Sequence, residues 1–387
     1  MLSLKNWKKY LTGGVFALSL FHFINHIYAL ALPPLFPLLK AEFGVGNTQV
    51  GMITSVISFT MVMFQLPLGM SSDRIGRKRI LFACLTFMIV ATLLTSWSTA
   101  FWMILAFQVM LGFGVSGYHP VGISAVADLA PPGKSGKFMS LQAIGGSLGV
   151  GIAPLLMGGL ASIYGWRIPL RIIGLAGLPL LLYMGYSMQE PQEQDEEDGA
   201  QVEAEKLIVV GIALFYMFRA FAFKSLGTFL PTYLVEVRDF SLAWGGFTTS
   251  LLLITGAFAQ PLGGILADRF NRTNIVVISA CSAAFFLFLV NTIPLVRTLL
   301  FLVLVLLGFS LYISMPAILS LVKEVTPSKG YGKAFGINFT TMAISGTVAP
   351  VVVGMIADSY SLSTAFEILP ILLVLAGLSI LMIRHRV

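Results

Sequence analysis

Long apolar segments, separated by short clusters of charged or turn-forming residues, make up most of this chain. A helix that crosses a membrane needs about 20 consecutive apolar residues, and these segments have that length. The pattern predicts an all-α membrane protein with twelve membrane-spanning helices. The predicted spans are residues 11–38, 48–69, 80–98, 101–127, 137–162, 168–188, 207–233, 243–266, 273–295, 298–322, 333–357 and 365–383.

One long polar stretch interrupts this pattern between the sixth and seventh spans. It runs from Glu190 to Glu205 and contains eight of the 17 acidic residues of the chain. A block of like charges repels itself and stays solvated, which favours a flexible linker over the alternative of an acidic regulatory segment. We therefore expect an N-terminal six-helix bundle over residues 1–189, an acidic linker over 190–206 and a C-terminal six-helix bundle over 207–387.

The two sets of spans contain matching residues at a nearly constant spacing. Four residues recur 195 positions later, and these are Gln65, Gly69, Asp73 and Arg74, matched by Gln260, Gly264, Asp268 and Arg269. Nine more recur 196 positions later, and these are Gly112, Phe113, Pro120, Pro131, Gly136, Lys137, Pro154, Gly158 and Tyr164, matched by Gly308, Phe309, Pro316, Pro327, Gly332, Lys333, Pro350, Gly354 and Tyr360. We interpret the chain as a duplicated six-helix unit, with both copies in the same topology because six is an even number.

Lysine and arginine are unevenly divided between the two sides that this topology defines. The termini and the even-numbered loops carry 17 of them, whereas the odd-numbered loops carry only four. Cytoplasmic loops of membrane proteins are enriched in these residues. We therefore expect both termini and the acidic linker to be cytoplasmic, and the chain to lie in the cytoplasmic (inner) membrane.

The composition excludes several classes of protein. Charged residues make up 11% of the chain, hydrophobic residues make up 57%, and the mean hydropathy is +0.89. Soluble domains contain about a quarter charged residues, so a cytosolic enzyme is excluded and the lipid bilayer is the expected surrounding. The net charge of +7 is interpreted as a topology signal, and no nucleic-acid partner is expected.

A basic motif lies between the second and third spans. The segment Gly69–Arg79 reads GMSSDRIGRKR, and a degenerate copy at Gly264–Arg272 reads GILADRFNR. Together with the twelve spans and the repeat, this motif resembles the signature loop of the major facilitator superfamily of transporters. The resemblance implies that the loop helps to latch a cytoplasmic gate, whereas the alternative is a loop that serves topology alone. The expected gating residues are Gly69, Asp73, Arg74, Gly76, Arg77, Asp268 and Arg269.

The first half carries further short motifs. These are His22–Asn25 (HFIN), Leu32–Pro33, Leu38–Phe43 (LLKAEF), Gly117–Pro120 (GYHP), Gln142–Gly146 (QAIGG) and Ala153–Leu156 (APLL). Within the superfamily they resemble the fosmidomycin-resistance branch. The chain departs from that branch at His26 and Val121, where an aspartate and a glutamate are usual, and it has Gln108 where many proton-coupled exporters have an arginine. Drug–proton antiport therefore does not transfer from the resemblance alone.

The seventh span contains two cations. Arg219 lies 12 residues after Leu207, about 18 Å along a helix and hence near the middle of the bilayer. A charged side chain there costs roughly 2.5–3.5 kcal/mol on insertion scales, so it needs a functional or structural partner. We expect Arg219 to bind substrate, with a structural bond to backbone carbonyls as the alternative. Lys224 is turned about 140° from it, and either binds substrate or extends toward the membrane surface.

Histidines add to these candidates. His22 and His26 are four residues apart in the first span and therefore share a face, with Asn25 beside them. His119 precedes Pro120 in the fourth span, and the resemblance implies that spans 1, 4, 7 and 10 line the transport cavity. Each histidine is expected to contact substrate, with a hydrogen-bonded packing role as the alternative.

Other polar residues in the spans are candidates for the same site. Gln142 and Asn338 occupy equivalent positions in the repeat, and amides at matched depth suit either substrate binding or interhelical bonds. Tyr312 of the tenth span and Gln108 of the fourth complete the set. No aspartate or glutamate falls in the middle of a predicted span, so a cavity built from these residues attracts anions and disfavours cations.

The sequence thus predicts a secondary transporter that moves a small organic anion, of carboxylate or phosphonate type, by alternating access. A histidine is the expected carrier of a coupling proton. Export of amphipathic drugs by proton antiport is the alternative within transport. A different class is an intramembrane metal enzyme with His22, His26 and His119 as ligands, which the duplication and the lack of a nearby cysteine or carboxylate disfavour. We expect a monomer, not an enzyme, without a cofactor or a bound metal.

Overall fold

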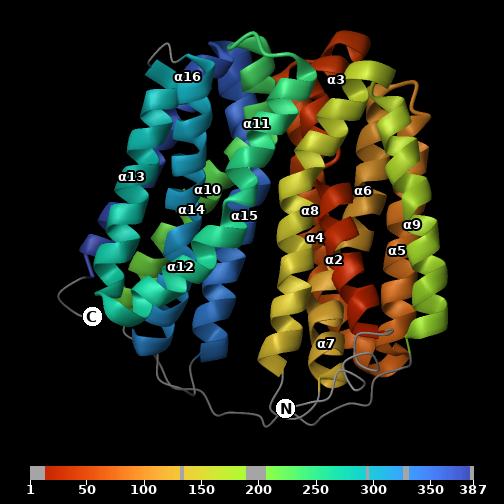
Figure 1. Ribbon diagram of the computed structural model, residues 1–387, viewed down its shortest axis with the longest axis horizontal. Helices are drawn as coiled ribbons and strands as arrows, with labels where there is room; N and C mark the ends of the chain where they lie inside the picture. The colour runs from red at the N-terminus through yellow and green to blue at the C-terminus, as the bar shows by residue number, and fades with distance from the viewer. Residues whose placement is uncertain (1–13, 131–134, 189–205, 293–295, 326–330, 384–387) are drawn as a thin grey trace. The chain divides into compact units, whose positions relative to one another are not determined.

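The computed structural model describes residues 14–130, 135–188, 206–292, 296–325 and 331–383, shown as ribbon in Figure 1. Regular structure in these residues is helical throughout. The predicted acidic linker, apart from Lys206, lies outside the described residues, as do the first 13 residues and the last four.

Twelve helical stretches of the described residues are long and apolar enough to cross a membrane, which confirms the predicted number. Their bounds are Gly14–Phe43, Asn47–Ile75, Arg77–Ser96, Phe101–Leu129, Lys137–Tyr164, Arg167–Ser187, Ile208–Glu236, Leu242–Arg269, Arg272–Thr292, Arg297–Val322, Thr340–Ser359 and Leu362–Leu381. The first two stretches extend furthest past their predicted ends, to Phe43 instead of residue 38 and to Ile75 instead of residue 69, so that α4 continues past Gly69 into the basic motif.

The chain divides into two compact units. Unit 1 comprises residues 1–44 and 56–196, and unit 2 comprises residues 45–55 and 197–387. The first six helical spans are built from α2 (Gly14–Ala29), η1 (Pro33–Leu35), α3 (Phe36–Phe43), α4 (Asn47–Ile75), α5 (Arg77–Ser96), α6 (Phe101–Gly117), η2 (Tyr118–Gly122), α7 (Ile123–Leu129), α8 (Ser135–Tyr164) and α9 (Arg167–Ser187). The last six are built from α10 (Lys206–Glu236), α11 (Leu242–Ile254), α12 (Gly256–Arg269), α13 (Arg272–Thr292), α14 (Arg297–Val325), α15 (Tyr331–Ser359) and α16 (Leu362–Leu381).

Helix packing repeats between the units. In unit 1 the closest pairs are α2 with α8, α5 with α6, and α5 with α9. Unit 2 has the corresponding pairs α10 with α15, α13 with α14, and α13 with α16. In each unit these pairs join the first span with the fifth, the third with the fourth and the third with the sixth. A duplicated six-helix unit requires this correspondence.

Small residues set the distance between α2 and α8. A Cβ added to Gly145 would collide with the Ser19 carbonyl, and one added to Gly149 would collide with the Phe23 carbonyl. The two backbones therefore approach more closely than side chains would allow, which is the usual way that membrane helices pack without a hydrophobic driving force. This contact fixes α2, the helix that carries two of the candidate histidines.

Candidate functional site

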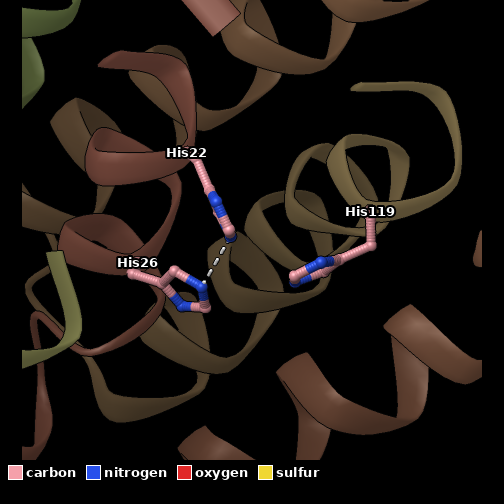
Figure 2. A group of neighbouring side chains, drawn as sticks. All are labelled: His22, His26 and His119. Atoms are coloured by element: carbon pink, nitrogen blue, oxygen red, sulfur yellow. Dashed lines mark hydrogen bonds between the residues drawn. The ribbon is translucent and has the colours of Figure 1, made fainter. Parts of the chain in front are cut away.

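Three histidines of unit 1 point toward one another (Figure 2). His22 and His26 come from successive turns of α2, and His119 comes from η2. The Nε2 atoms of His22 and His26 are 3.1 Å apart, and one ring nitrogen from each of the three histidines lies within 4.8 Å of the other two. His22 is buried, whereas His26 and His119 are half-buried. We call these three residues the histidine cluster.

His22 is held on three sides. Its Nδ1 lies 2.9 Å from the carbonyl oxygen of Gln142, which can only accept, so Nδ1 carries the proton of this bond. The imidazole stacks on Tyr118 with ring centroids 4.6 Å apart, and a Cβ at Gly146 would overlap the ring. With Nδ1 occupied as a donor, neutral His22 presents the lone pair of Nε2 to the rest of the cluster.

A π-helical turn positions His119. The turn spans Tyr118–Gly122 between α6 and α7 and includes Pro120, which has no N–H to donate. Such turns are rare and occur often at functional sites. In unit 2 the equivalent segment lies inside α14, which is unbroken from Arg297 to Val325, and Met315 at the position of His119 packs against the hydrophobic core. The histidine cluster therefore has no counterpart in the described part of unit 2.

Two amides near the cluster are buried. Asn25 is fully buried on α2, and neither atom of its amide has a hydrogen-bond partner among the described residues. The Gln142 side chain is also buried, and its amide nitrogen has no hydrogen-bond partner among the described residues. A buried polar group without a partner costs about 1–3 kcal/mol, so such groups gather where a ligand or an ion is bound.

Gln108 is bonded within the bundle through one of its two amide atoms, because its amide oxygen has no hydrogen-bond partner among the described residues. Its amide nitrogen donates to the hydroxyl of Thr95 at 3.1 Å, which joins α6 to α5. The sequence placed this residue in the substrate site. The interhelical bond that glutamine commonly makes in packed membrane helices is present, and the contact of Gln108 with substrate stays a prediction.

Arg219 is buried on α10 in unit 2. Its Nη2 donates to the Leu311 carbonyl of α14 at 2.5 Å, and the guanidinium lies 5.5 Å from the centre of the Phe223 ring. The structural bond that the sequence left open is therefore present. It satisfies only part of the group, because Nε has no hydrogen-bond partner and Arg219 forms no ion pair within the described residues. A small cavity beside it is lined by Ser279, Ser310 and Ser314, among others.

Lys224 faces a different neighbour. It is half-buried on α10, and its Cγ lies near Gly346 of α15. Neither an ion pair nor a hydrogen bond joins it to another described residue. Arg219 and Lys224 therefore point toward different helices, as their angular separation on α10 requires.

The remaining candidates of unit 2 differ in how their polar atoms are used. Tyr312 of α14 is half-buried, and its ring packs edge to face on Phe223 at 5.4 Å, one residue from Leu311. Asn338 of α15 is buried, and its amide oxygen is unpaired within the described residues. Tyr312 thus belongs to the surroundings of Arg219.

The basic motif at the ends of α4 and α5 contacts η2 and α7 of unit 1. Gly69 of α4 packs against Pro120 of η2, where an added Cβ would lie 3.2 Å from the proline. Arg77 at the start of α5 forms an ion pair with Asp128 of α7, and only 13% and 9% of these side chains are exposed. Asp73 and Arg74 are exposed at the end of α4. Asp128, which lies one residue beyond the predicted end of the fourth span, is thus the motif's buried charge partner.

The degenerate copy in unit 2 begins its second helix in a different way from the motif in unit 1. Asp268 and Arg269 are exposed at the end of α12, as their counterparts are in unit 1. Asn271 replaces Gly76, and its side chain accepts the backbone N–H of Asn274 at 3.0 Å to cap α13. Gly76 itself has φ of +105°, a conformation open almost only to glycine.

Replacing Gly76 by alanine is therefore expected to lower the free energy of unfolding by about 1–3 kcal/mol. The matched control is Gly159→Ala in the interior of α8, where an added Cβ meets open space and helix propensity favours alanine by about 1 kcal/mol. Thermal unfolding in detergent should thus shift downward for Gly76→Ala and not for Gly159→Ala. Equal midpoints for the two variants would contradict the role given to Gly76.

Comparison with known families gives a match across most of the chain. The model of the family described as Major Facilitator Superfamily matches residues 18–258 and 212–387. A solved structure also aligns, a bacterial homologue of the human lysosomal transporter Spinster in an inward-facing and occupied conformation. The TM-score is 0.86 at 17% identity, and 96% of each chain is covered.

Curated relatives are similar over nearly the full length. A probable sulfoacetate transporter of Cupriavidus necator is 26% identical, covering 88% of this chain and 86% of the relative. The fosmidomycin resistance protein of Escherichia coli is 24% identical, covering 97% of this chain and 93% of the relative.

Proposed function

The chain belongs to the Major Facilitator Superfamily, whose members are multi-pass membrane transporters rather than enzymes, and from this premise we propose that it transports a small organic anion. Transport would proceed by alternating access of its two six-helix bundles, as in other secondary transporters built from repeats. The proposed substrate carries a carboxylate, sulfonate or phosphonate group. Arg219 is the proposed partner of that group, and the histidine cluster is the proposed carrier of a coupling proton.

One observation carries the anionic assignment. α10 holds two cations within the apolar part of the chain, and no carboxylate pairs with either among the described residues. A buried charge without a counterion is costly, and an anionic ligand removes that cost when it binds. A cationic substrate would instead increase the electrostatic cost of these buried cations.

A guanidinium suits the proposed substrate class. Its planar fork of donors matches the two oxygens of a carboxylate, sulfonate or phosphonate, and charge-assisted pairs of this kind are the stronger hydrogen bonds of proteins. The Arg219 Nε without a partner supplies one donor, since Nη2 is bonded to Leu311. The relative named as a probable sulfoacetate transporter supports this substrate class, because sulfoacetate is a small dianion.

His22 and His26, whose Nε2 atoms contact each other, are proposed to carry the coupling proton. At 3.1 Å, the two Nε2 atoms share one proton when both rings are neutral, and uptake of one further proton gives the pair a positive charge. The ordinary pKa of histidine is about 6.5, so such a group is suited to exchange protons near neutral pH.

A proteoliposome assay tests the function. Reconstituted protein is given sulfoacetate, fosmidomycin or a lipophilic organic cation, with equal pH on both sides or with an imposed gradient. We expect the gradient to raise accumulation of at least one anion above the level at equal pH, and His26→Ala to abolish this increase. His385→Ala, which changes the histidine outside the described residues, is the matched control and should keep it.

The outcomes separate the proposals. Accumulation of the cation but of neither anion would contradict the anionic assignment. If pH gradients of both signs leave anion uptake unchanged, the proposal of proton coupling is wrong. The proposal of anion transport is not affected by that result. An acidic exterior that drives uptake indicates symport, whereas an acidic interior that drives it indicates antiport.

Drug efflux by proton antiport is the second candidate. The observation that favours it is the similarity to the fosmidomycin resistance protein over nearly the whole chain. In the same assay, fosmidomycin accumulation driven only by an acidic interior would support this candidate.

A further inference from the structure

We propose that His22, His26 and His119 bind one divalent transition-metal ion of the zinc class. This inference goes beyond anion transport and does not depend on the role of Arg219, because all three ligands lie in unit 1. Three imidazole nitrogens would hold the ion, and the fourth position of a tetrahedral site would take water or an anionic oxygen.

The distances suit such an ion. Zinc–nitrogen bonds of about 2.0–2.1 Å place tetrahedral nitrogens about 3.3–3.4 Å apart. The Nε2 atoms of His22 and His26 already lie 3.1 Å from each other, and the third nitrogen is within 4.8 Å. A movement of the His119 ring by at most about 1.5 Å would bring its nitrogen to that distance, and the pair on α2 is already close enough.

The arrangement around His22 resembles the support of a metal ligand. A ligating histidine usually donates its second ring N–H to a carbonyl or carboxylate, which fixes the tautomer and aims the free nitrogen at the metal. The bond from His22 Nδ1 to the Gln142 carbonyl has this form. Stacking on Tyr118 and the space left by Gly146 then hold the ring in place.

His119 provides a second, independent observation. It is brought to the cluster by the π-helical turn, whereas the equivalent helix of unit 2 is unbroken and carries Met315. This local departure from α-helix geometry adds a third imidazole to a pair, and π-helical turns are rare and occur frequently at functional sites.

The donor set selects the metal. Imidazole nitrogens suit zinc, copper and nickel, whereas magnesium and calcium require oxygen ligands. The sequence led us to expect no metal because neither cysteine nor carboxylate accompanies the histidines. Three nitrogens are sufficient for an open site, and the half-buried rings of His26 and His119 leave the cluster accessible to an ion.

Metal and proton compete for the same nitrogens. Histidine binds metal in its neutral form, so binding releases protons and weakens as the pH falls below about 6.5. A cluster that carries a coupling proton is therefore not metal-bound at the same moment. Metal binding is measurable without any transport substrate, which keeps its test apart from the test of transport.

The experiment uses the full chain, purified with an affinity tag that contains no histidine and stripped with a chelator. Titration with Zn²⁺ alone is expected to show one site per chain, with weaker binding at pH 5.5 than at pH 7.5. With Co²⁺ in its place, the visible spectrum should show the intense bands of a four-coordinate ion.

Variants identify the ligands. His26→Ala and His119→Ala are each expected to weaken Zn²⁺ binding more than about tenfold, since loss of an outer-shell partner alone costs 10- to 100-fold. His385→Ala is the control and should bind as the parent does. His119→Cys retains a ligand and should add a thiolate-to-cobalt charge-transfer band, so it reports on the site even where an alanine variant folds poorly.

The proposal is overturned if the parent protein binds no stoichiometric Zn²⁺, or if its affinity is the same in His119→Ala. A six-coordinate Co²⁺ spectrum without a new band in His119→Cys would also overturn it. If the stripped protein transports anions but binds no metal, the metal site is wrong and the proposed function stands.

Discussion

Replacing Arg219 by alanine is expected to reduce anion uptake by proteoliposomes by about 30-fold or more. Truncating one member of a buried, hydrogen-bonded charge pair costs about 2–5 kcal/mol, and each 1.4 kcal/mol is a factor of ten. In the parent protein the bound anion is the proposed counterion of the Arg219 guanidinium, which has no ion pair among the described residues. Uptake is measured as an initial rate over a range of substrate concentrations.

Arg219→Gln separates charge from structure. A glutamine keeps an uncharged polar group on α10, but its amide nitrogen takes the position of Arg219 Nε and ends short of the Leu311 carbonyl that Nη2 contacts at 2.5 Å. Its unfolding temperature is therefore measured beside its uptake, so that loss of the bond and loss of the charge are told apart. Arg297→Ala removes an exposed arginine from the start of α14 and should leave uptake unchanged. Normal uptake by stable Arg219→Gln protein would show that the arginine is structural.

Breaking the ion pair between Arg77 and Asp128 is expected to have the second largest effect. Removal of one partner leaves the other charge uncompensated, which costs about 3–5 kcal/mol for a fully buried pair and about 2 kcal/mol where part of each side chain reaches solvent. Asp128→Ala should therefore lower the temperature of unfolding and the rate of transport. The pair joins α5 to α7, so its loss frees the end of the fourth span from the basic motif.

The exchanged variant, Arg77→Asp with Asp128→Arg, tests whether the pairing itself matters. It is expected to recover part of the stability lost in Asp128→Ala, as measured in a double-mutant cycle. Arg79→Ala is the matched control, because Arg79 is exposed and its one hydrogen bond to a described residue is a long one, to the Ile75 carbonyl at the end of α4 at 3.4 Å. An Asp128→Ala protein as stable and as active as Arg79→Ala would contradict the role of the pair.

The spans and the repeat were predictable from sequence because they depend only on the length, the hydrophobicity and the spacing of residues. Breaks within spans were not. The π-helical turn at Tyr118–Gly122 and the interruption at Thr255 both lie inside apolar runs, where hydrophobicity does not change. A proline such as Pro120 can interrupt a helix, but it does not specify which local geometry replaces the α-helix.

The candidate site was predictable only where residues share one helix. Spacing alone places His22 and His26 on one face of α2, and it separates Arg219 from Lys224 on α10. Partners on different helices depend on rotation and packing that one sequence does not reveal. Gln108 therefore proved to bond across to Thr95, and Asp128 escaped notice as the partner of Arg77.

The π-helical turn lies between the histidine cluster and the ion pair of Arg77 with Asp128. A π turn holds one more residue than an α turn, and one residue of α-helix corresponds to a rotation of about 100°. If Tyr118–Gly122 returned to α geometry with α6 fixed, α7 would rotate by that angle and carry Asp128 away from Arg77. His119 lies within the same turn, so its side chain would take part of this rotation and shift relative to the other two histidines. A change of one residue in the turn would therefore alter both sets of contacts at once.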